Sequence, residues 1–333
     1  MPRKGPEHGR RRDAATTPSI DQTVLAEALA GLSQACKTLP PKLFYDEEGC
    51  RLFRRITELP EYYLTRTERG LLETAAPSVA AAMPPGALLV EYGASDEDKA
   101  EFLLRERHAS GVAVFAAYMP IDVATEGLEQ ARARLNRSYP HLRVHTMTAD
   151  FLRPVALPAA FAGMPRLGFF PGSTIGNFEP PDARRFLAQV RDTLGNSALF
   201  LVGVDLRKDP AVLIPAYNDA AGVTAAFNRN MLVRLNREAG ADFDVDAFSH
   251  NAIWNETKGR MEMHLVSQRD QVARIAGKNI RFTRNETIHT ENSYKYTLKD
   301  FAALASLAGW CTCHVWTDAR CLFSVHLLGS DQV

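Results

Sequence analysis

The stretch ALLVEYG, residues 87–93, decides the fold, because a short apolar run that ends in glycine is typical of a strand buried in a parallel sheet. Four further runs predict strands of the same sheet: VAVFAAYMPID (112–122), LRVHTMTAD (142–150), RLGFFPGS (166–173) and SALFLVGVD (197–205). Amphipathic segments between them, such as 123–136 and 181–194, favour helices. Strands that alternate with helices predict a doubly wound α/β sheet, which binds ligands at the carboxyl ends of its strands.

The pattern changes on both sides of this alternating region. Before it, helices are expected at residues 20–38, within 42–68 and at 67–80, with Pro60 ending the second helix and leaving Tyr62 and Tyr63 on a loop. After it, we expect mostly one long helix over 216–240, three antiparallel strands over 260–268, 271–277 and 278–284, and a helix over 297–308. The segments CTCHVWTD (311–318) and CLFSVHLLG (321–329) look like the final strands of the first sheet.

These changes predict two domains that share the chain in alternation. Residues 67–205 and 293–333 should form the domain around the parallel sheet. Residues 19–66 and 206–292 should pack together as a second, α+β domain. Residues 1–18 are polar and contain Gly and Pro, so we expect a disordered tail.

The composition favours a small-molecule partner. Lys and Arg number 39, as do Asp and Glu, so the net charge is zero and no overall field attracts nucleic acid or an acidic membrane. No run of about 18 apolar residues predicts a membrane span, and the basic N-terminal residues are not followed by the apolar stretch of a secretory signal. The five cysteines are odd in number and irregularly spaced, which predicts reduced thiols and a cytoplasmic protein.

Three residues that follow successive predicted strands are candidates for binding a cofactor. Gly93 allows close approach of backbone and ligand, and Asp122 can accept both hydroxyls of a ribose. Asp150 could accept from an adenine amino group. The acids at 96–98 would repel a pyrophosphate, which favours S-adenosylmethionine, a sulfonium without phosphate, over a nicotinamide cofactor. Alternatively, Asp122 and Asp150 only cap the turns that follow the strands.

Two further segments carry candidates for binding an amino acid. Asn177, in FFPGSTIGNFEP (169–180), offers a donor and an acceptor to a zwitterion, or else caps the next helix. Glu291 and Ser293 are two residues apart, so in an extended segment they share a face and could grip both nitrogens of an imidazole. Alternatively, both residues lie on a solvent-exposed edge strand and bind nothing.

No metal site is expected. The fragment Cys311-x-Cys313-His314 resembles half of a zinc site, but no second half with matching spacing is present. Neither a G-x-S-x-G nor a Walker motif occurs, so hydrolase and kinase functions lack support.

Several long blocks resemble one known family, the histidine Nα-methyltransferases of ergothioneine biosynthesis. The blocks are FYD (44–46), LPEYYLTRTE (59–68), GSTIGN (172–177), AYNDAAGVTAAFNRN (216–230), ADFDVDAFSH (241–250) and Met261-Glu262-Met263. The resemblance covers about residues 38–330. It implies a Rossmann-like S-adenosylmethionine methyltransferase sheet with a second, substrate-binding α+β domain. It also implies that the protein trimethylates L-histidine to hercynine.

The resemblance also implies a role for each matching residue. Tyr45, Asn177 and Tyr217 should hold the α-amino and α-carboxylate groups as the catalytic set. Around the imidazole we expect Tyr62, Glu291 and Ser293, with Met263 lining the wall. At the cofactor, Asp122 and Asp150 should bind the ribose and adenine ends, and Gly93 and Lys99 should lie beside the methionine part.

One segment departs from the family pattern. The family usually carries Gly-Ser-Gly here, whereas this chain has Gly93-Ala94-Ser95 and then acids before Lys99. If the second glycine position needs a positive φ, Ser95 costs roughly 1 kcal/mol. We therefore expect S-adenosylmethionine to bind more weakly than in typical relatives, which calorimetry can measure.

Three alternatives remain open from the sequence. The first is an N-methyltransferase for another amino acid, such as a tryptophan derivative; Glu291 and Ser293 argue for imidazole, since an indole has one donor and no acceptor. The second is a binding protein that has lost catalysis. The third, a nicotinamide dehydrogenase, is disfavoured by the acids at 96–98 and by the missing third glycine. A monomer is expected.

Overall fold

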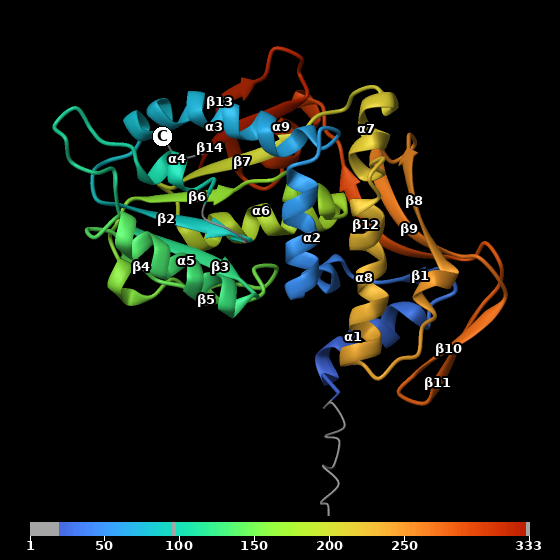
Figure 1. The fold of residues 1–333 in the computed structure, drawn as a ribbon. Coiled ribbons are helices and arrows are strands. Elements are labelled where there is room, and N and C mark those ends of the chain that lie inside the picture. The colour runs from blue at the N-terminus through green and yellow to red at the C-terminus, as the bar shows by residue number, and fades with distance from the viewer. Residues whose placement is uncertain (1–19, 95–97, 331–333) are drawn as a thin grey trace, which may run out of the picture.

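The computed structural model describes residues 20–94 and 98–330, and a large mixed sheet forms its centre (Figure 1). In spatial order its strands are β13 (Trp310–Thr317), β14 (Phe323–Ser330), β7 (Leu199–Asp205), β6 (Arg166–Phe170), β2 (Ala87–Tyr92), β3 (Phe115–Asp122) and β4 (Arg143–Val144), with β5 (Met147–Thr148) also beside β3. The strands from β7 to β5 are parallel to their neighbours, whereas β14 is antiparallel to β7 and to β13. The order reverses direction between β2 and β6, where sheets of this kind bind ligands.

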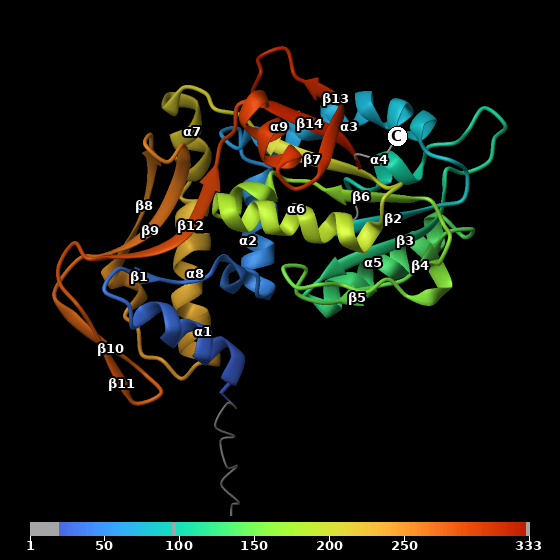
Figure 2. The same ribbon diagram turned by 180° about the vertical axis from the view of Figure 1, so that it is seen from behind.

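Helices cover both faces of this sheet, because alternate residues of a buried strand face opposite sides. Leu89 packs in one hydrophobic cluster with α3 (Tyr63–Ala82) and α4 (Glu101–Leu104). Its neighbours Leu88 and Val90 pack in a second cluster with α6 (Pro180–Leu194) and α9 (Leu298–Ser306). Figure 2 shows α6 across the face opposite α3, and α5 (Thr125–Ser138) connects β3 to β4.

A second, smaller sheet lies beside the first (Figure 1). Its order is β1 (Lys37–Thr38), β12 (Thr287–Tyr294), β9 (Arg260–Ser267) and β8 (Phe248–Asn255). The inner face, which includes Met263, packs against helices α1 (Gln22–Leu32), α7 (Pro210–Tyr217) and α8 (Val223–Glu238), and α2 (Glu47–Thr57) packs against α8. A separate hairpin, β10 (Gln271–Ile275) and β11 (Lys278–Phe282), projects from this part.

The predicted α/β fold with a parallel sheet is confirmed, and the segments at 311–318 and 321–329 do complete the first sheet. The pairing of β1 with β12 joins the two segments that were expected to form a second domain. However, β12 crosses the expected boundary at 292/293, and one hydrophobic cluster runs through both parts. The division into two domains stays a prediction, and the expected tail at 1–18 lies outside the described residues.

Two expected helices were wrong in extent. The helix expected over 20–38 ends at Leu32, because the following residues turn and form β1 against β12. The helix expected over 216–240 begins only at Val223, as α8, because residues 216 and 217 end α7. Gly222 has a φ of +72°, and Asp219 accepts the N–H groups of Val223 and Thr224, so a new helix begins there.

Two further expectations need correction. The strand expected over 142–150 is interrupted between β4 and β5, which each pair with a different part of β3. Tyr63 was expected on a loop but is the first residue of α3, which begins earlier than the helix expected over 67–80. Among the described helices, none is long and apolar enough to cross a lipid bilayer.

Candidate active site

The carboxyl ends of β2, β3 and β5 meet at one edge of the central sheet, where Gly93, Asp122 and Asp150 lie. The Gly93 amide donates to the Ile121 carbonyl at 2.9 Å, and the Ala149 amide donates to the Asp122 carbonyl at 3.0 Å. Gly93 has a φ of +73°, a conformation that residues with a Cβ rarely adopt. These bonds hold the three predicted cofactor residues side by side.

The two carboxylates at this edge also cap the turns that follow them. Asp122 Oδ1 accepts the N–H of Ala124 at 2.9 Å, and Asp150 Oδ1 accepts the N–H of Leu152 at 3.0 Å. Burial raises the pKa of Asp122, and backbone N–H groups of the turn oppose that change. The capping alternative is therefore present, but an ionised carboxylate has about four acceptor sites, so capping leaves room for a ligand.

Lys99 pairs with a buried acid that the sequence did not single out. Lys99 Nζ lies 2.7 Å from Glu68 Oε2, and the Gly172 amide donates to both Glu68 oxygens at 2.8 and 3.0 Å. Glu68 is 1% exposed and packs so closely on β7 that a Cβ at Gly203 would lie 2.0 Å from it. This pair ties α3 to the loop after β6. Ser95, with its neighbours 96 and 97, lies outside the described residues, so the expected weaker cofactor binding stays a prediction.

Tyr45 and Tyr62 lie on either side of Phe53 in α2. The ring centroids are 5.9 Å apart for Tyr45 and Phe53 and 6.3 Å apart for Phe53 and Tyr62, both edge-on. Phe227 of α8 packs against Tyr45 and Phe53 at 6.0 and 5.9 Å. The packing of α2 on α8 therefore brings these two tyrosines together.

Tyr217 and Ser293 are in direct contact. Tyr217, the last residue of α7, has its hydroxyl 2.8 Å from Ser293 Oγ on β12, and both side chains are buried. Lys295 Nζ donates to each of these hydroxyls at 2.8 Å. The structure thus joins two predicted substrate residues through a lysine that was not predicted.

Asn177 lies on the short helical turn η3 (Thr174–Asn177) after β6. Gly176 approaches β12 so closely that a Cβ there would lie 2.7 Å from the carbonyl oxygen of Tyr294. Glu179, not Asn177, is the N-cap residue of α6, and no side chain makes the capping bond. The alternative role of Asn177 as a helix cap is therefore not found; its side chain is half-buried, and η3 packs against β12.

A β-bulge at Thr290 decides which face of the second sheet Glu291 occupies. His289 lies opposite His264, whereas Glu291 lies opposite Met263, so the register shifts by one between them. In a regular strand, Glu291 would share a face with His289; the extra residue turns it to the inner face, beside Met263. Thr290 Oγ1 donates to the Met263 carbonyl, and His289 Nε2 donates to the Glu291 carbonyl, both at 3.0 Å.

Burial and nearby negative charge keep the tyrosines of the site protonated. Burial raises the pKa of Glu291 to about 7, and the charge of Lys295 opposes this rise. Burial is also the main reason that the pKa values of Tyr45, Tyr62 and Tyr217 are raised, and the negative charge of Glu291 raises all three further. The three tyrosines are therefore neutral phenols near pH 7 and act as hydrogen-bond donors and acceptors.

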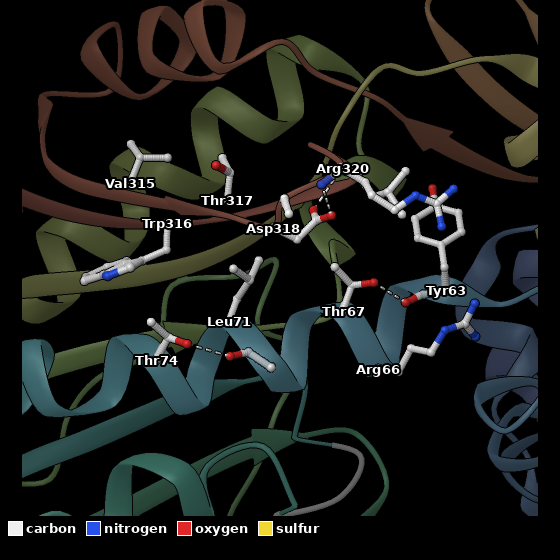
Figure 3. A pocket seen from close by; sticks show the side chains of 13 residues that line it. Tyr63, Arg66, Thr67, Leu71, Thr74, Val315, Trp316, Thr317, Asp318 and Arg320 are labelled. Atoms are coloured by element: carbon white, nitrogen blue, oxygen red, sulfur yellow. Dashed lines mark hydrogen bonds between the residues drawn. The ribbon is translucent and has the colours of Figure 1, made fainter.

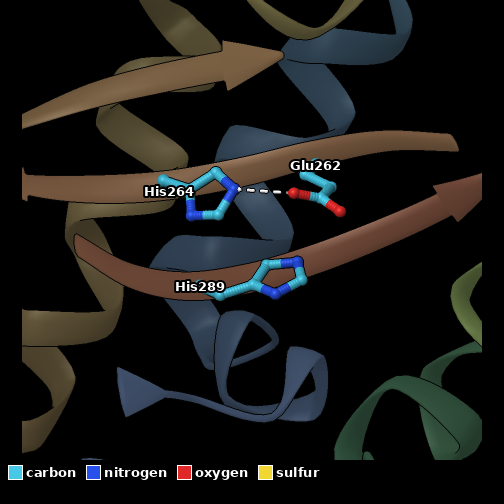
Figure 4. Close-up of side chains that lie close together, drawn as sticks. All are labelled: Glu262, His264 and His289. Atoms are coloured by element: carbon cyan, nitrogen blue, oxygen red, sulfur yellow. Dashed lines mark hydrogen bonds and ion pairs between the residues drawn. The ribbon is translucent and has the colours of Figure 1, made fainter. Parts of the chain in front are cut away.

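A cluster on the outer face of the second sheet contains potential metal ligands (Figure 4). The ligand atoms of Glu262, His264 and His289 all lie within 4.8 Å of one another. Arg260 and Asn255 donate to Glu262 Oε1 at 2.7 and 3.0 Å, and His264 Nε2 lies 3.1 Å from Oε2. Burial raises the pKa of Glu262, but these hydrogen bonds more than offset it and hold the pKa at about 2. Because Arg260 already neutralises the carboxylate, the cluster fits an ion-pair network better than a cation site.

A separate hollow of about 870 Å³ lies between α3 and β13 (Figure 3). It is lined by α3 residues such as Thr67 and Leu71 and by β13 residues such as Trp316. None of the predicted site residues lines it. Tyr63 does, and its hydroxyl lies 2.9 Å from both carboxylate oxygens of Asp205.

Asp205, Lys208 and Lys295 form a buried charged group that sequence reasoning missed. Lys208 Nζ lies 2.6 Å from Asp205 Oδ1, and Lys295 Nζ lies 2.6 Å from Oδ2. Two signals could have found them. Asp205 ends a strand of the sheet as Asp122 does, and Lys295 follows Ser293 by two residues in an extended segment.

This strand order, with an antiparallel hairpin at one end and acids after successive parallel strands, defines a Rossmann-like S-adenosylmethionine-dependent methyltransferase. The donor set fits that cofactor: Asp122 and Asp150 offer acceptors, Gly93 allows close approach, and Glu68 neutralises Lys99, which leaves little to attract a pyrophosphate. The chain belongs to the family of histidine-specific, S-adenosylmethionine-dependent methyltransferases, whose model matches residues 24–330. The resemblance seen in the sequence is thereby confirmed, and the protein is an N-methyltransferase.

Three relatives indicate the range of substrates among similar proteins. The chain is 40% identical over 311 residues to a histidine N-alpha-methyltransferase of Mycolicibacterium smegmatis, covering 93% of this chain and 95% of that protein. It is 32% identical over 302 residues to ergothioneine biosynthesis protein 1 of Neurospora crassa, covering 89% of this chain and 34% of that protein. It is also 25% identical over 324 residues to a 4-dimethylallyltryptophan N-methyltransferase of Epichloe festucae, covering 91% and 94%.

Proposed function

We propose that this protein transfers three methyl groups from S-adenosylmethionine to the α-amine of L-histidine, giving hercynine in ergothioneine biosynthesis. The observation that carries the proposal is the pair Glu291 and Ser293 on the inner face of β12, with Met263 opposite Glu291 and Tyr217 bonded to Ser293. A carboxylate acceptor beside a hydroxyl donor matches the N–H and the lone pair of a neutral imidazole. The two histidine- and ergothioneine-related relatives support the same substrate.

A tryptophan derivative fits this pair less well, although one relative acts on such a compound. An indole has a single N–H donor, which Glu291 could accept. Ser293 would then be left buried without a partner on the ligand, which costs free energy. The pair therefore favours imidazole.

The α-amino and α-carboxylate groups are assigned to Tyr45, Asn177 and Tyr217. The Asn177 amide can donate to a carboxylate and accept from an amine, the neutral Tyr45 hydroxyl can do the same, and the Tyr217 oxygen can accept from the amine. Tyr62 is assigned to the imidazole side, next to Phe53. The pKa of Tyr45 is raised by burial, then by the charges of Glu291, Cys50 and Asp122.

At the cofactor edge, Asp122 and Asp150 would accept the ribose hydroxyls and the adenine amino group, and Gly93 and Lys99 would border the methionine part. S-adenosylmethionine supplies an electrophilic methyl group on a sulfonium when it is bound. The protein's main task is to hold the amine nitrogen in line with that methyl group at about 3 Å. Residues that fix the carboxylate and the ring perform this alignment from two ends of the amino acid.

The attacking amine must be neutral, whereas a free amino acid is mostly protonated at pH 7. Because Tyr45 and Tyr217 stay protonated themselves, they do not take up this proton, so the pocket must favour the neutral amine or pass the proton to water. Repeated methylation requires contacts that do not change as methyl groups are added. The hydrogen bonds from Asn177 to the carboxylate meet this requirement.

We propose that the protein acts as a monomer, and its zero net charge favours a small-molecule partner over nucleic acid. The five cysteines are free. Together with the lack of a disulfide framework, this supports a reducing compartment such as the cytoplasm.

Mass spectrometry of the product formed from L-histidine and S-adenosylmethionine tests the proposal, with Asp122→Ala as the matched control for cofactor binding. We expect a product that carries three methyl groups with the wild type and none with the variant. Product that stops at one methyl group would overturn trimethylation, and unmethylated histidine with folded wild-type protein would overturn the function.

A further inference from the structure

Lys295 is a fully buried lysine whose ammonium group has all its donors engaged. Its Nζ donates to Tyr217 Oη and to Ser293 Oγ at 2.8 Å each and lies 2.6 Å from Asp205 Oδ2. An ammonium group has three donors and no acceptor. Lys295 therefore cannot accept a proton from either hydroxyl, and both hydroxyl oxygens must accept from it.

This constraint fixes how many protons Tyr217 and Ser293 can offer to a ligand. Their oxygens are 2.8 Å apart, so one hydroxyl donates to the other. Tyr217 is the donor to Ser293, because a phenol is a stronger acid than an aliphatic hydroxyl, so both acceptor positions of Ser293 Oγ are filled, by Lys295 and by Tyr217. The Ser293 O–H then has only the direction of the ligand left, and it can act there as a donor and not as an acceptor.

Lys295 also balances the charge of Glu291. Asp205 is already paired with Lys208, whose Nζ lies 2.6 Å from Oδ1. Asp205, Lys208 and Lys295 together carry one positive charge, which the ionised Glu291 cancels. Lys295 opposes the rise in the pKa of Glu291 that burial causes, so it favours the ionised form, which is an acceptor only.

We propose that Lys295, held by Asp205, is a positioning residue for ring recognition: it keeps Ser293 a donor to the ring, beside the carboxylate of Glu291. A site prepared in this way selects a neutral ring that carries one N–H and one lone-pair nitrogen, and it rejects rings without them. This proposal rests on the proposed function, because it assigns a cause to the choice of imidazole.

The test compares two amino acids with rings of similar size. Calorimetry measures the dissociation constants of L-histidine and of 3-(2-thienyl)alanine, whose ring has no N–H, with S-adenosylhomocysteine present so that no methyl group is transferred. In Lys295→Met, we expect the preference for histidine to fall by about ten- to a hundredfold, through weaker histidine binding, because Ser293 is no longer held as a donor to the ring and the ionised form of Glu291 loses the support of the lysine charge.

Lys208→Met is the matched control. It removes the other lysine of Asp205, but Lys208 contacts Tyr63 and the Leu206 carbonyl and neither of the two hydroxyls at issue. We expect Lys208→Met to keep the preference for histidine. If wild type and Lys295→Met prefer histidine equally, and the variant has a native circular dichroism spectrum, the role of Lys295 is overturned and the proposed function stands. Wild-type protein that binds neither amino acid would overturn the proposed function.

A second measurement on the wild type does not depend on whether the variant folds. ¹⁵N NMR of ring-labelled histidine bound to the protein distinguishes a nitrogen that carries a proton from one that does not. The proposal predicts one of each at pH 7. Two protonated nitrogens would require Ser293 to accept a hydrogen bond, which the contacts of Lys295 and Tyr217 exclude, and would overturn it.

Discussion

Asn177 is the site residue whose substitution should change substrate binding with the least effect on folding. Its side chain is half-buried, and the capping role that would make it structural is not found. We expect Asn177→Ala to raise the KM for histidine about tenfold or more, because it loses hydrogen bonds to a charged carboxylate that are worth roughly 1.5–3 kcal/mol. Steady-state kinetics measure this effect.

Asn251→Ala, at an exposed position of β8, is the control for that variant. It should leave both the KM and the melting temperature unchanged. An Asn177→Ala enzyme with the wild-type KM would remove Asn177 from the substrate site.

Glu291 gives the protein a distinctive dependence of stability on pH. Its pKa is raised from 4.5 to about 7 in the folded protein, so between these values the folded state keeps a proton that the unfolded state has lost. The contribution of Glu291 to stability is complete below about pH 4.5 and is lost as the pH rises to about 7. Glu291→Gln should therefore gain stability relative to wild type over this range, by up to roughly 3 kcal/mol.

Urea denaturation at a series of pH values measures that difference. Glu262→Gln is the control, because the pKa of Glu262 is lowered to about 2 and its carboxylate is ionised in both states above about pH 5. Its difference from wild type should be constant there. A constant difference for Glu291→Gln as well would mean that burial does not shift the pKa of Glu291.

The residues of the site could be predicted to the extent that they carry a local signal. Asp122 and Asp150 follow apolar runs, and Glu291 and Ser293 have the spacing of one strand face. The buried ion pairs carry no such signal, because a charged residue in a sequence is normally exposed. Lys295 can be buried because its partner Asp205, which is distant in the sequence, lies beside it at the end of β7.

At the scale of elements, the contact between η3 and β12 joins the cofactor side of the site to the substrate side. Gly176 makes this contact possible, since a Cβ would lie 2.7 Å from the Tyr294 carbonyl oxygen. We expect Gly176→Ala to push η3 away from β12, which moves Asn177 relative to Ser293. Histidine affinity should fall at least tenfold while cofactor affinity is kept, and calorimetry measures both.

Gly70→Ala is the matched glycine control, because nothing lies within 4 Å of a Cβ at that position in α3. It should be neutral or stabilise the helix by roughly 0.5–1 kcal/mol. If Gly176→Ala binds histidine as the wild type does, the alignment of η3 with β12 does not control the substrate site.

The type of most elements followed from the sequence, but their interruptions did not. The break between α7 and α8 depends on Gly222 in a positive-φ conformation and on Asp219 as a cap, within a segment whose apolar spacing suits one helix. The bulge at Thr290 leaves no periodic signal, because the strand continues on both sides. Thr290 Oγ1 donates to the Met263 carbonyl on the neighbouring strand, a contact that the sequence of β12 alone does not show, and His289 Nε2 donates to the Glu291 carbonyl.

At the scale of the whole molecule, one hydrophobic cluster joins the two expected domains. It includes Leu43 and Met263 from the second part and Leu72 and Phe323 from the part around the central sheet. We therefore expect a single cooperative unfolding transition in urea. The urea transition of the wild type, followed by circular dichroism, should coincide with the transition of Trp254→Phe, followed by fluorescence. In that variant the fluorescence comes from Trp310 and Trp316 in β13 alone. Two separated transitions would show that the expected domains fold independently.

The proposed function requires the whole molecule, since the cofactor edge belongs to the central sheet and the ring-binding pair to the second sheet. The most direct test is mass spectrometry after incubation of the protein with S-adenosylmethionine and an equimolar mixture of the twenty amino acids. We predict that histidine alone gains methyl groups and that it gains three. Methylation of another amino acid in preference to histidine, or no methylation by folded protein, would contradict the account.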